Sequence, residues 1–354
     1  MLRLDEELSC MNLGAEQLQV RKTLQGSTDS SLYAIKHLRK DLFATSHEKR
    51  SAFRSAAADL VLEAQFLSRI DHPNIIKLRG WAVGGTTCFA SGQHDSYFLV
   101  LDRLEMTLAN RIEEWKREQG QPQDAIHAME EKLDILIQLA SVLEYLHERR
   151  IVYRDLKVDN VGLTHDKSTV QLFDLGLARE LPPCCENENK SQDELFRMSG
   201  VGTRRYCAPE VVLGERYNLQ VDVYSLTLVL YEMMLHTKPF EVMGPESHRV
   251  LVAEGGQRPP LPSSLPVELQ DLMDSGWATM PSDRPIMKDF LQRLEKIQDT
   301  ELRKANAKST SWLRSPFLVL PELIRTLSGS DGYSFCTSTS TDKLSTYDIF
   351  DSEL

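Results

Sequence analysis

Short apolar runs of the strand type dominate the first hundred residues of the chain. LQVRKTL (18–24) and LYAIKHL (32–38) flank the turn-rich QGSTDSS, a pattern typical of a β-hairpin. YFLVLD (97–102) is a further short apolar run of the kind found in buried strands. Residues 16–101 are therefore expected to form a strand-rich region.

Helical periodicity occurs once within that region and then dominates residues 105–298. The segment 47–70 repeats apolar residues at helical spacing, and its apolar face carries Leu60, Ala64 and Leu67. EEKLDILIQLASVLEYLHERR has the i, i+3, i+4, i+7 spacing of a core helix. VDVYSLTLVLYEMML is apolar nearly all round, which predicts a helix buried in the middle of its region. A larger helical part is thus expected after the strand-rich one.

The end of the chain has a different composition. From about residue 299 it is rich in Ser and Thr, which predicts a flexible tail, 299–354, that adds little to the core. Within it, WLRSPFLVLPELIRTL carries an apolar patch that would dock on the rest of the chain or bind a partner. A tail with neither role is an equally open interpretation.

Composition and charge narrow the class of protein. The 354 residues contain no apolar run of the roughly 18–20 residues that a membrane span needs. The acidic start MLRLDEELSC is unlike a signal peptide. Six scattered cysteines without CxxC pairs indicate a reduced, cytoplasmic protein, with the nucleus left open. The net charge of −11 argues against nucleic acid as the main partner.

Candidate chemistry lies in IVYRDLKVDN and LFDLGLA. These segments place Asp155, Lys157, Asn160 and Asp174 within about 20 residues, on loops beside strand-like runs. Phosphoryl transfer from a nucleotide needs a carboxylate to orient the attacking hydroxyl, oxygen ligands for Mg²⁺ and cations near the phosphates. Asp155 suits the first role and Lys157 the last, while amide and carboxylate oxygens of Asn160 and Asp174 suit Mg²⁺. Each residue alone is more often a solvated loop residue, but their joint order indicates phosphoryl transfer.

The motifs between about residues 30 and 295 resemble, in order, those of a eukaryotic protein kinase. YRDLKVDN is similar to the family's catalytic loop, DLG to its magnesium loop and GTRRYCAPE to the end of its activation segment. The resemblance implies an α+β, two-lobed fold. Its N-lobe would be small and mainly antiparallel β with one helix, called αC in the family, and its C-lobe larger and mainly helical. The resemblance also implies ATP and Mg²⁺ as cofactors and proteins as substrates.

The same resemblance assigns the catalytic residues. YAIK is similar to the strand-three lysine motif, so Lys36 would bind the α- and β-phosphates. DLVLEAQFLSRIDHPNII resembles αC and the loop after it, and Glu63, nine residues before His72, has the position of the glutamate that pairs with this lysine. If either partner of a buried ion pair is removed, the other remains buried without a counter-charge. The implied catalytic set is Lys36, Glu63, Asp155, Lys157, Asn160 and Asp174, with Asn160 and Asp174 as metal ligands.

The adenine would lie against the segment that follows YFLVL. Leu101 corresponds to the gatekeeper behind the base, and the hinge from Asp102 to Leu104 would hydrogen-bond the base through its backbone. Gly162 stands where many kinases have a bulky residue on the pocket floor, and Leu163 is expected to cover for it. The implied nucleotide-binding residues are Ala34, Lys36, Leu101, Asp102, Leu104, Leu163 and Asp174.

Details of the motifs indicate a serine/threonine kinase. Lys157 and Thr203 are the residues that such kinases carry, and GWATMPSDRP resembles the tyrosine-kinase-like group of serine/threonine kinases. Tyr153 replaces the usual histidine before Arg-Asp, and Leu175 replaces the phenylalanine of DFG. Both replacements are expected to leave the function of these motifs unaffected. The family's late structural anchors correspond to Asp222 and to a pair of Arg284 with Glu210.

The activation segment offers a candidate regulatory site. Arg154 precedes Asp155, and in the family such an arginine joins a basic pocket that captures a phosphate. LPPCCENENKSQDELFRMSG supplies Ser191 and Ser199 as acceptors for an upstream activating kinase or for autophosphorylation. These serines are equally well interpreted as polar loop residues.

The start of the chain departs from the family pattern. NLGAEQLQVRKTL contains one glycine, Gly14, where the family's phosphate lid is rich in them. If Gly14 were the first lid glycine, Glu16 and Gln19 would replace the others, and Glu16 would repel phosphate oxygens. If LQVRKTL is instead the second strand, residues 1–15 hold at most a remnant of strand one and the lid, which is then degenerate or truncated at the N-terminus. The second interpretation is favoured.

Three functions remain open from the residues. The favoured one is an ATP-dependent protein serine/threonine kinase, the alternative is a pseudokinase or scaffold without catalysis, and the third is a small-molecule phosphotransferase. Five clustered charges and an amide would cost packing and desolvation without a structural return, which favours catalysis. The expected domains are residues 1–15, a kinase domain 16–298 (N-lobe 16–101, hinge 102–105, C-lobe 106–298) and the tail 299–354.

Overall fold

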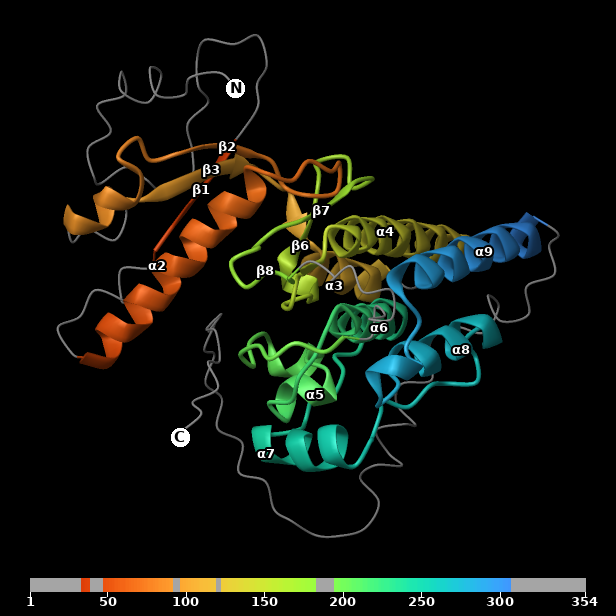
Figure 1. The fold of residues 1–354 in the computed structure, drawn as a ribbon. Helices are drawn as coiled ribbons and strands as arrows, with labels where there is room; N and C mark the ends of the chain where they lie inside the picture. Colours follow the sequence, from red (N-terminus) through yellow and green to blue (C-terminus); the bar gives the residue numbers. More distant parts are fainter. Residues whose placement is uncertain (1–32, 39–46, 92–95, 119–121, 183–193, 307–354) are drawn as a thin grey trace, which may run out of the picture.

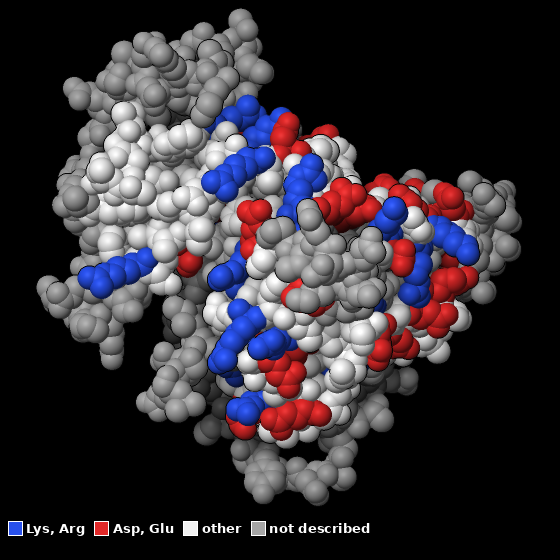
Figure 2. Space-filling view, viewed as in Figure 1, with Lys and Arg blue, Asp and Glu red and all other residues white. Residues whose placement is uncertain are grey.

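The computed structural model describes residues 33–38, 47–91, 96–118, 122–182 and 194–306, arranged as two lobes (Figure 1). The predicted strand LQVRKTL, the glycine-poor start, Ser191 and the tail after 306 lie outside these residues. Among the described helices, none is both long and apolar enough to cross a membrane. On the face shown in Figure 2, acidic and basic side chains of the C-lobe are interspersed.

Within the described residues, the N-lobe contains a three-stranded antiparallel sheet in the order β1-β3-β2. Its strands are β1 (Tyr33–His37), β2 (Leu78–Trp81) and β3 (Phe98–Asp102). The apolar run predicted as a buried strand is β3, the central strand, and its Leu99 is fully buried. The register places Ala34 opposite Leu101 and Lys36 opposite Leu99, so the lysine motif lies directly beside this apolar centre.

Helix α2 (His47–Leu67) lies beside this sheet (Figure 1). Leu60, Ala64 and Leu67 are all buried and lie four and three residues apart, so they share one face, as the pattern predicted. Glu63 is 1% exposed on the same part of the helix. A buried carboxylate is costly unless it is paired, so this position calls for a cation nearby.

The C-lobe is mainly helical and carries two small sheets. Its longer helices are α3 (Leu108–Glu118), α4 (Pro122–Glu148), α6 (Gln220–Leu235), α8 (Val267–Gly276) and α9 (Met287–Asn306). Short helical segments of the chain are η2 (Gly85–Ser91), η3 (Val158–Asn160), η4 (Arg204–Tyr206), α5 (Pro209–Val212), α7 (Pro245–Ser247), η5 (His248–Glu254) and η6 (Pro281–Asp283). The antiparallel sheets are β4 (Met106–Thr107), β6 (Val161–Leu163) and β7 (Val170–Leu172), and β5 (Ile151–Val152) with β8 (Arg179–Glu180). Figure 1 shows β6, β7 and β8 on the side of the C-lobe that faces α2.

Helix α6 forms the centre of the C-lobe. Every residue from Val221 to Met234 is buried, in agreement with the prediction from a run that is apolar nearly all round. The helix ends at His236, whose φ of 52° is in the left-handed region. Helix α9 packs along α4 and continues to Asn306, so the helix extends past residue 298, where the tail was expected to begin.

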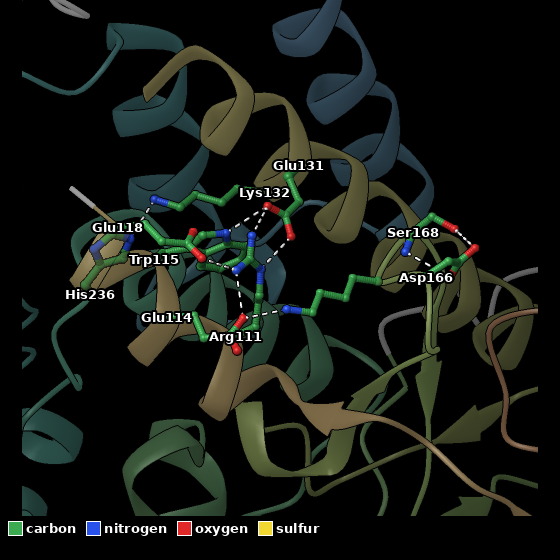
Figure 3. Close-up of polar contacts among 10 residues, drawn as sticks. Arg111, Glu114, Trp115, Glu118, Glu131, Lys132, Asp166, Ser168 and His236 are labelled. Carbon is green, nitrogen blue, oxygen red and sulfur yellow. Dashed lines mark hydrogen bonds and ion pairs between the residues drawn. The ribbon is translucent and has the colours of Figure 1, made fainter. Parts of the chain in front are cut away.

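A buried polar cluster joins α3, α4 and the end of α6 (Figure 3). Lys132 on α4 is 3% exposed, and its Nζ lies 2.7 Å from Nε2 of His236. The same Nζ lies 5.2 Å from the ring centroid of Trp115, whose indole N–H donates to Glu131 at 2.9 Å. Arg111 donates twice to Glu131, each time at 2.8 Å. Charged groups as well as apolar contacts therefore hold these three helices together.

Candidate active site

The two lobes are joined through a lysine of the N-lobe sheet. Lys36 on β1 places Nζ 2.7 Å from Oε2 of Glu63 on α2 and 2.8 Å from Oδ1 of Asp174, in the loop after β7. These partners are 27 and 138 positions away in the chain. Strand, helix and loop thus bring together three of the residues that the sequence assigned to one site.

Lys36 carries its charge although the site is largely enclosed. Burial by itself lowers the pKa of Lys36, but Glu63 and Asp174 outweigh this effect and the net pKa is raised. Burial raises the pKa of Glu63, while Lys36 opposes the shift and Asp174 adds to it. Removing either member of the pair would leave the other buried without its counter-charge.

The loop between β5 and β6 holds a second group of predicted residues around Asp155, which is 4% exposed. Its Oδ1 accepts hydrogen bonds from the backbone N–H and the hydroxyl of Thr203, both at 2.8 Å. Its Oδ2 lies 3.0 Å from both Asn160 Nδ2 and Lys157 Nζ. Lys157 also donates to the Thr203 hydroxyl at 2.8 Å. These contacts hold together Asp155, Lys157 and Asn160. The threonine, which belongs to the predicted activation segment, is hydrogen-bonded to the same group.

A buried carboxylate on α6 fixes the backbone of this loop. Asp222 is fully buried and accepts the backbone N–H groups of Tyr153 at 2.8 Å and Arg154 at 2.9 Å. Its Oδ2 also lies 2.9 Å from Nε2 of His147. Arg154 has a φ of 73°, a strained conformation that persists when its surroundings enforce it. Asp222, predicted as an anchor, supplies that constraint one residue before Asp155.

The predicted magnesium loop, which contains Asp174, is packed between the loop that holds Asp155 and α2. The hydroxyl of the fully buried Tyr153 donates to the Phe173 carbonyl at 2.5 Å, so the residue that replaces histidine contacts this loop. Leu175 is also fully buried. A Cβ on Gly176 would lie 3.0 Å from the backbone oxygen of Asp59, which makes this close approach to α2 suited to glycine.

Asp59 is a residue near the site that the sequence reasoning missed. Burial raises its pKa to about 6, Asp174 adds to the shift, and Arg154 and Lys36 oppose it. The signal was its position four residues before Glu63, which places both carboxylates on one face of the helix. Asp59 is therefore a further carboxylate that interacts with Lys36, and the site raises its pKa as it raises that of Glu63.

The predicted hinge runs between two fixed residues. The guanidinium of Arg79 donates to both carboxylate oxygens of Asp102, at 2.5 and 2.8 Å. The backbone N–H of Asp102 donates to the Lys77 carbonyl at 3.2 Å. On the other side, the backbone N–H of Glu105 donates to the Leu163 carbonyl at 2.8 Å. Asp102 is thus held by the N-lobe sheet and Glu105 by a C-lobe sheet.

Leu104, from the hinge, fills the space beside Gly162. A Cβ on Gly162 would lie 2.2 Å from Cδ1 of Leu104. The expectation that Leu163 covers for the missing side chain was wrong, because neighbouring residues on a strand point to opposite faces, and Leu163 is fully buried. Leu101, which is 5% exposed, lies opposite Ala34 in the sheet. The two pocket residues predicted from the N-lobe are therefore neighbours.

The predicted metal ligands can be tested by the chemistry of their oxygens. Asn160 uses its Nδ2 for Asp155, so its other side-chain atom is an amide oxygen, and Asp174 offers a carboxylate. Both are ligands that Mg²⁺ accepts, usually together with substrate phosphates and water. Among the described residues, no group of three or more His, Cys, Asp or Glu could form a cage for a metal by itself. The donor set fits Mg²⁺ held jointly with phosphates.

The predicted pair of Arg284 with Glu210, the second of the late structural anchors, is also present. Arg284 donates through both terminal nitrogens to Glu210, at 2.7 and 2.8 Å, and the two residues are 3% and 4% exposed. Bidentate arginine–carboxylate pairs are the stronger kind of ion pair. The structure brings this predicted pair together across 74 positions of the chain.

Arg154, the predicted phosphate ligand, has protein partners in the structure. Its Nε donates to the Leu177 carbonyl at 2.5 Å and its Nη1 to the hydroxyl of Tyr217 at 3.2 Å. Tyr217 in turn donates to the backbone carbonyl of Ser199, one of the two candidate acceptors, at 2.7 Å. Tyr217 was not predicted, because nothing in its local sequence connects it with either loop.

The site thus combines a charged lysine between two carboxylates with a linked group of Asp155, Lys157 and Asn160, the kinds of side chain that phosphoryl transfer requires. A family model described as "Protein kinase domain" matches residues 18–294, and the chain belongs to the protein kinase family. The prediction of that family and of its α+β, two-lobed fold is confirmed.

Several relatives are named as serine/threonine kinases. Serine/threonine/tyrosine-protein kinase HT1 of Arabidopsis thaliana is 29% identical over 242 residues, which is 67% of this chain and 54% of that protein. Serine/threonine-protein kinase Nek4 of Mus musculus is 30% identical over 267 residues, 75% of this chain and 29% of that protein. Mitogen-activated protein kinase kinase kinase 7 of Bos taurus is 29% identical over 253 residues, 70% of this chain and 37% of that protein. The chain thus spans about half or less of the length of these relatives.

Proposed function

We propose that the chain is an ATP-dependent protein serine/threonine kinase, which transfers the γ-phosphoryl group of Mg-ATP to serine and threonine hydroxyls of proteins. One observation carries the proposal. Asp155 Oδ1 and Lys157 Nζ both lie 2.8 Å from a single threonine hydroxyl, that of Thr203. This pair of side chains therefore has the geometry to hold an aliphatic alcohol between a carboxylate and an ammonium group.

The side chains divide the work of such a transfer. Asp155 would accept a hydrogen bond from the substrate hydroxyl, orient it and take its proton as the new O–P bond forms, while the bond from the γ-phosphorus to the bridging oxygen breaks and ADP leaves. Lys157 would offset negative charge beside that hydroxyl. Asn160 and Asp174 would hold Mg²⁺, and Lys36, fixed by Glu63, would contact the nucleotide phosphates. Mg-ATP, when bound, supplies the phosphoryl group and neutralises part of its charge.

The nucleotide site is assigned to the predicted residues, except that Leu104 takes the place beside Gly162 that was expected for Leu163. Ala34 and Leu101 would contact the base from the N-lobe, and the hinge from Asp102 to Leu104 would hydrogen-bond it. Leu104 supports the base from the side where Gly162 leaves room, because its side chain occupies that space. The proposed kinase domain is residues 16–298, with protein substrates as partners.

The proposal is tested by the Asp155→Asn variant of the full chain. With Mg-ATP and a generic basic protein, phosphate transfer is expected to fall by at least about a hundredfold, the usual contribution of a positioned general base. Asp159→Asn is a matched control, because Asp159 lies on the same loop but is exposed. Wild-type transfer no higher than that of Asp155→Asn would refute the proposal and leave the pseudokinase alternative.

A further inference from the structure

Tyr217 binds the segment 194–203 through both its backbone and its side chain. The backbone N–H of Phe196 donates to the Tyr217 carbonyl at 2.9 Å, and the N–H of Tyr217 donates to the Phe196 carbonyl at 3.0 Å. The Tyr217 hydroxyl donates to the Ser199 carbonyl at 2.7 Å, and the tyrosine is 1% exposed. Backbone and side chain of a single residue thus bind this segment at two points.

The same hydroxyl reaches the catalytic loop. It accepts a hydrogen bond from Arg154 Nη1 at 3.2 Å while it donates to Ser199. Burial raises the pKa of Tyr217, although Arg154 opposes the shift, so the phenol keeps its proton and can do both. Arg154 is further fixed by its bond to the Leu177 carbonyl, in the loop that follows Asp174. The hydroxyl therefore lies between the activation segment and the residue next to Asp155.

Beyond Ser199 the segment passes directly over the catalytic loop. Gly202 has a φ of 110°, and a Cβ at this position would lie 2.6 Å from the Arg154 backbone oxygen. Only glycine fits such a conformation and such an approach. The next residue is Thr203, whose N–H and hydroxyl both bond Asp155. A displacement at Ser199 would thus reach the catalytic carboxylate within four residues.

We propose that Tyr217 is a positioning residue for phosphoryl transfer, whose hydroxyl holds the activation segment against the catalytic loop. This deepens the proposed kinase function and rests on it. From the sequence, Arg154 was expected to bind a phosphate on the segment. In the structure, it donates hydrogen bonds to a tyrosine of the C-lobe and to a backbone carbonyl. The arrangement of the segment would then depend on these hydrogen bonds within the chain.

The test compares Tyr217→Phe with Tyr231→Phe in the full chain. Tyr231 is a suitable control, because it lies on α6, is 5% exposed and packs on Trp277, with ring centroids 6.1 Å apart. Tyr217→Phe is expected to lower kcat/KM for a protein substrate by about tenfold or more, as expected when a hydrogen bond to a charged group is lost. The KM for ATP is expected to stay unchanged, because Tyr217 does not contact the nucleotide residues.

Hydrogen exchange of the peptide that covers residues 194–203 gives a readout independent of activity. Exchange is expected to be faster in Tyr217→Phe than in Tyr231→Phe and wild type, because the Ser199 and Arg154 contacts are lost. Unchanged kinetics and unchanged exchange in Tyr217→Phe would overturn the proposal. If wild type transfers no more phosphate than Asp155→Asn, the kinase function fails, and the exchange comparison alone then decides whether Tyr217 anchors the segment.

Discussion

Lys132 provides the sharpest test of the energetics described above. Burial lowers its pKa from an ordinary value of 10.5 to about 7, with Glu131 opposing the shift and Arg111 adding to it. Burial also lowers the pKa of His236 to about 3, and Lys132 and Lys116 add to that shift, so the imidazole is neutral and can accept the hydrogen bond from Lys132. Keeping an ammonium group here therefore costs folding free energy that a neutral side chain would not cost.

The sign and size follow from proton linkage. The unfolded chain binds the Lys132 proton below about pH 10.5 and the folded chain only below about pH 7, so stability rises with pH between these values. At 1.36 kcal/mol for each pH unit, the penalty is about 4 kcal/mol at pH 7 and about 2 kcal/mol at pH 9. Lys132→Met removes this penalty but loses one hydrogen bond and the contact with Trp115, which costs about 1–3 kcal/mol. The variant is thus expected to be more stable than wild type by about 2 kcal/mol at pH 7, with the advantage gone near pH 9.

The measurement is the free energy of unfolding from urea titrations at pH 7, 8 and 9. Lys288→Met on α9 is the matched control, because Lys288 is exposed and the same atoms are exchanged. Groups that titrate elsewhere in the chain cancel when each variant is compared with wild type at the same pH. A difference between Lys132→Met and wild type that stays constant from pH 7 to pH 9 would refute the reasoning.

Two further substitutions test other contacts. Arg284→Met leaves Glu210 buried without its cation, and the free energy of unfolding in a denaturant titration is expected to fall by about 3–5 kcal/mol; a loss below about 1 kcal/mol would contradict the buried pair. Gly162→Leu forces a side chain into the space of Leu104, so calorimetry is expected to show weaker ATP binding. The double variant Gly162→Leu, Leu104→Ala is expected to restore that binding. Equal affinity in wild type, the single variant and the double variant would show that Leu104 does not form the pocket floor.

Residues that belong to continuous motifs were the ones that sequence reasoning placed together. Lys36, Glu63 and Asp174 meet in the structure because each lies in a short segment with its own recognisable pattern, and the Lys36–Glu63 pair was expected. The α6 helix was likewise predictable, since a run that is apolar all round has to be buried.

The contacts that were missed depend on side-chain directions across separate elements. Tyr217 reaches Arg154 over 63 positions, and Lys132 reaches His236 over 104, without any local pattern that links them. Leu104 lies over Gly162 because of the path that the hinge takes. The spacing of apolar residues in the sequence does not predict this path. The roles assigned to the site residues and the domain boundaries stay predictions.

The fixed ends of the hinge restrict how the lobes can rotate against each other. Asp102 is tied to β2 and Glu105 to β6, so torsional change between the lobes has to be absorbed by Arg103 and Leu104. Leu104 also fills the space beside Gly162, so any rotation of this two-residue pivot moves the side chain that lies there. A change in the angle between the lobes is therefore expected to shift the Leu104 side chain, and with it the space beside Gly162.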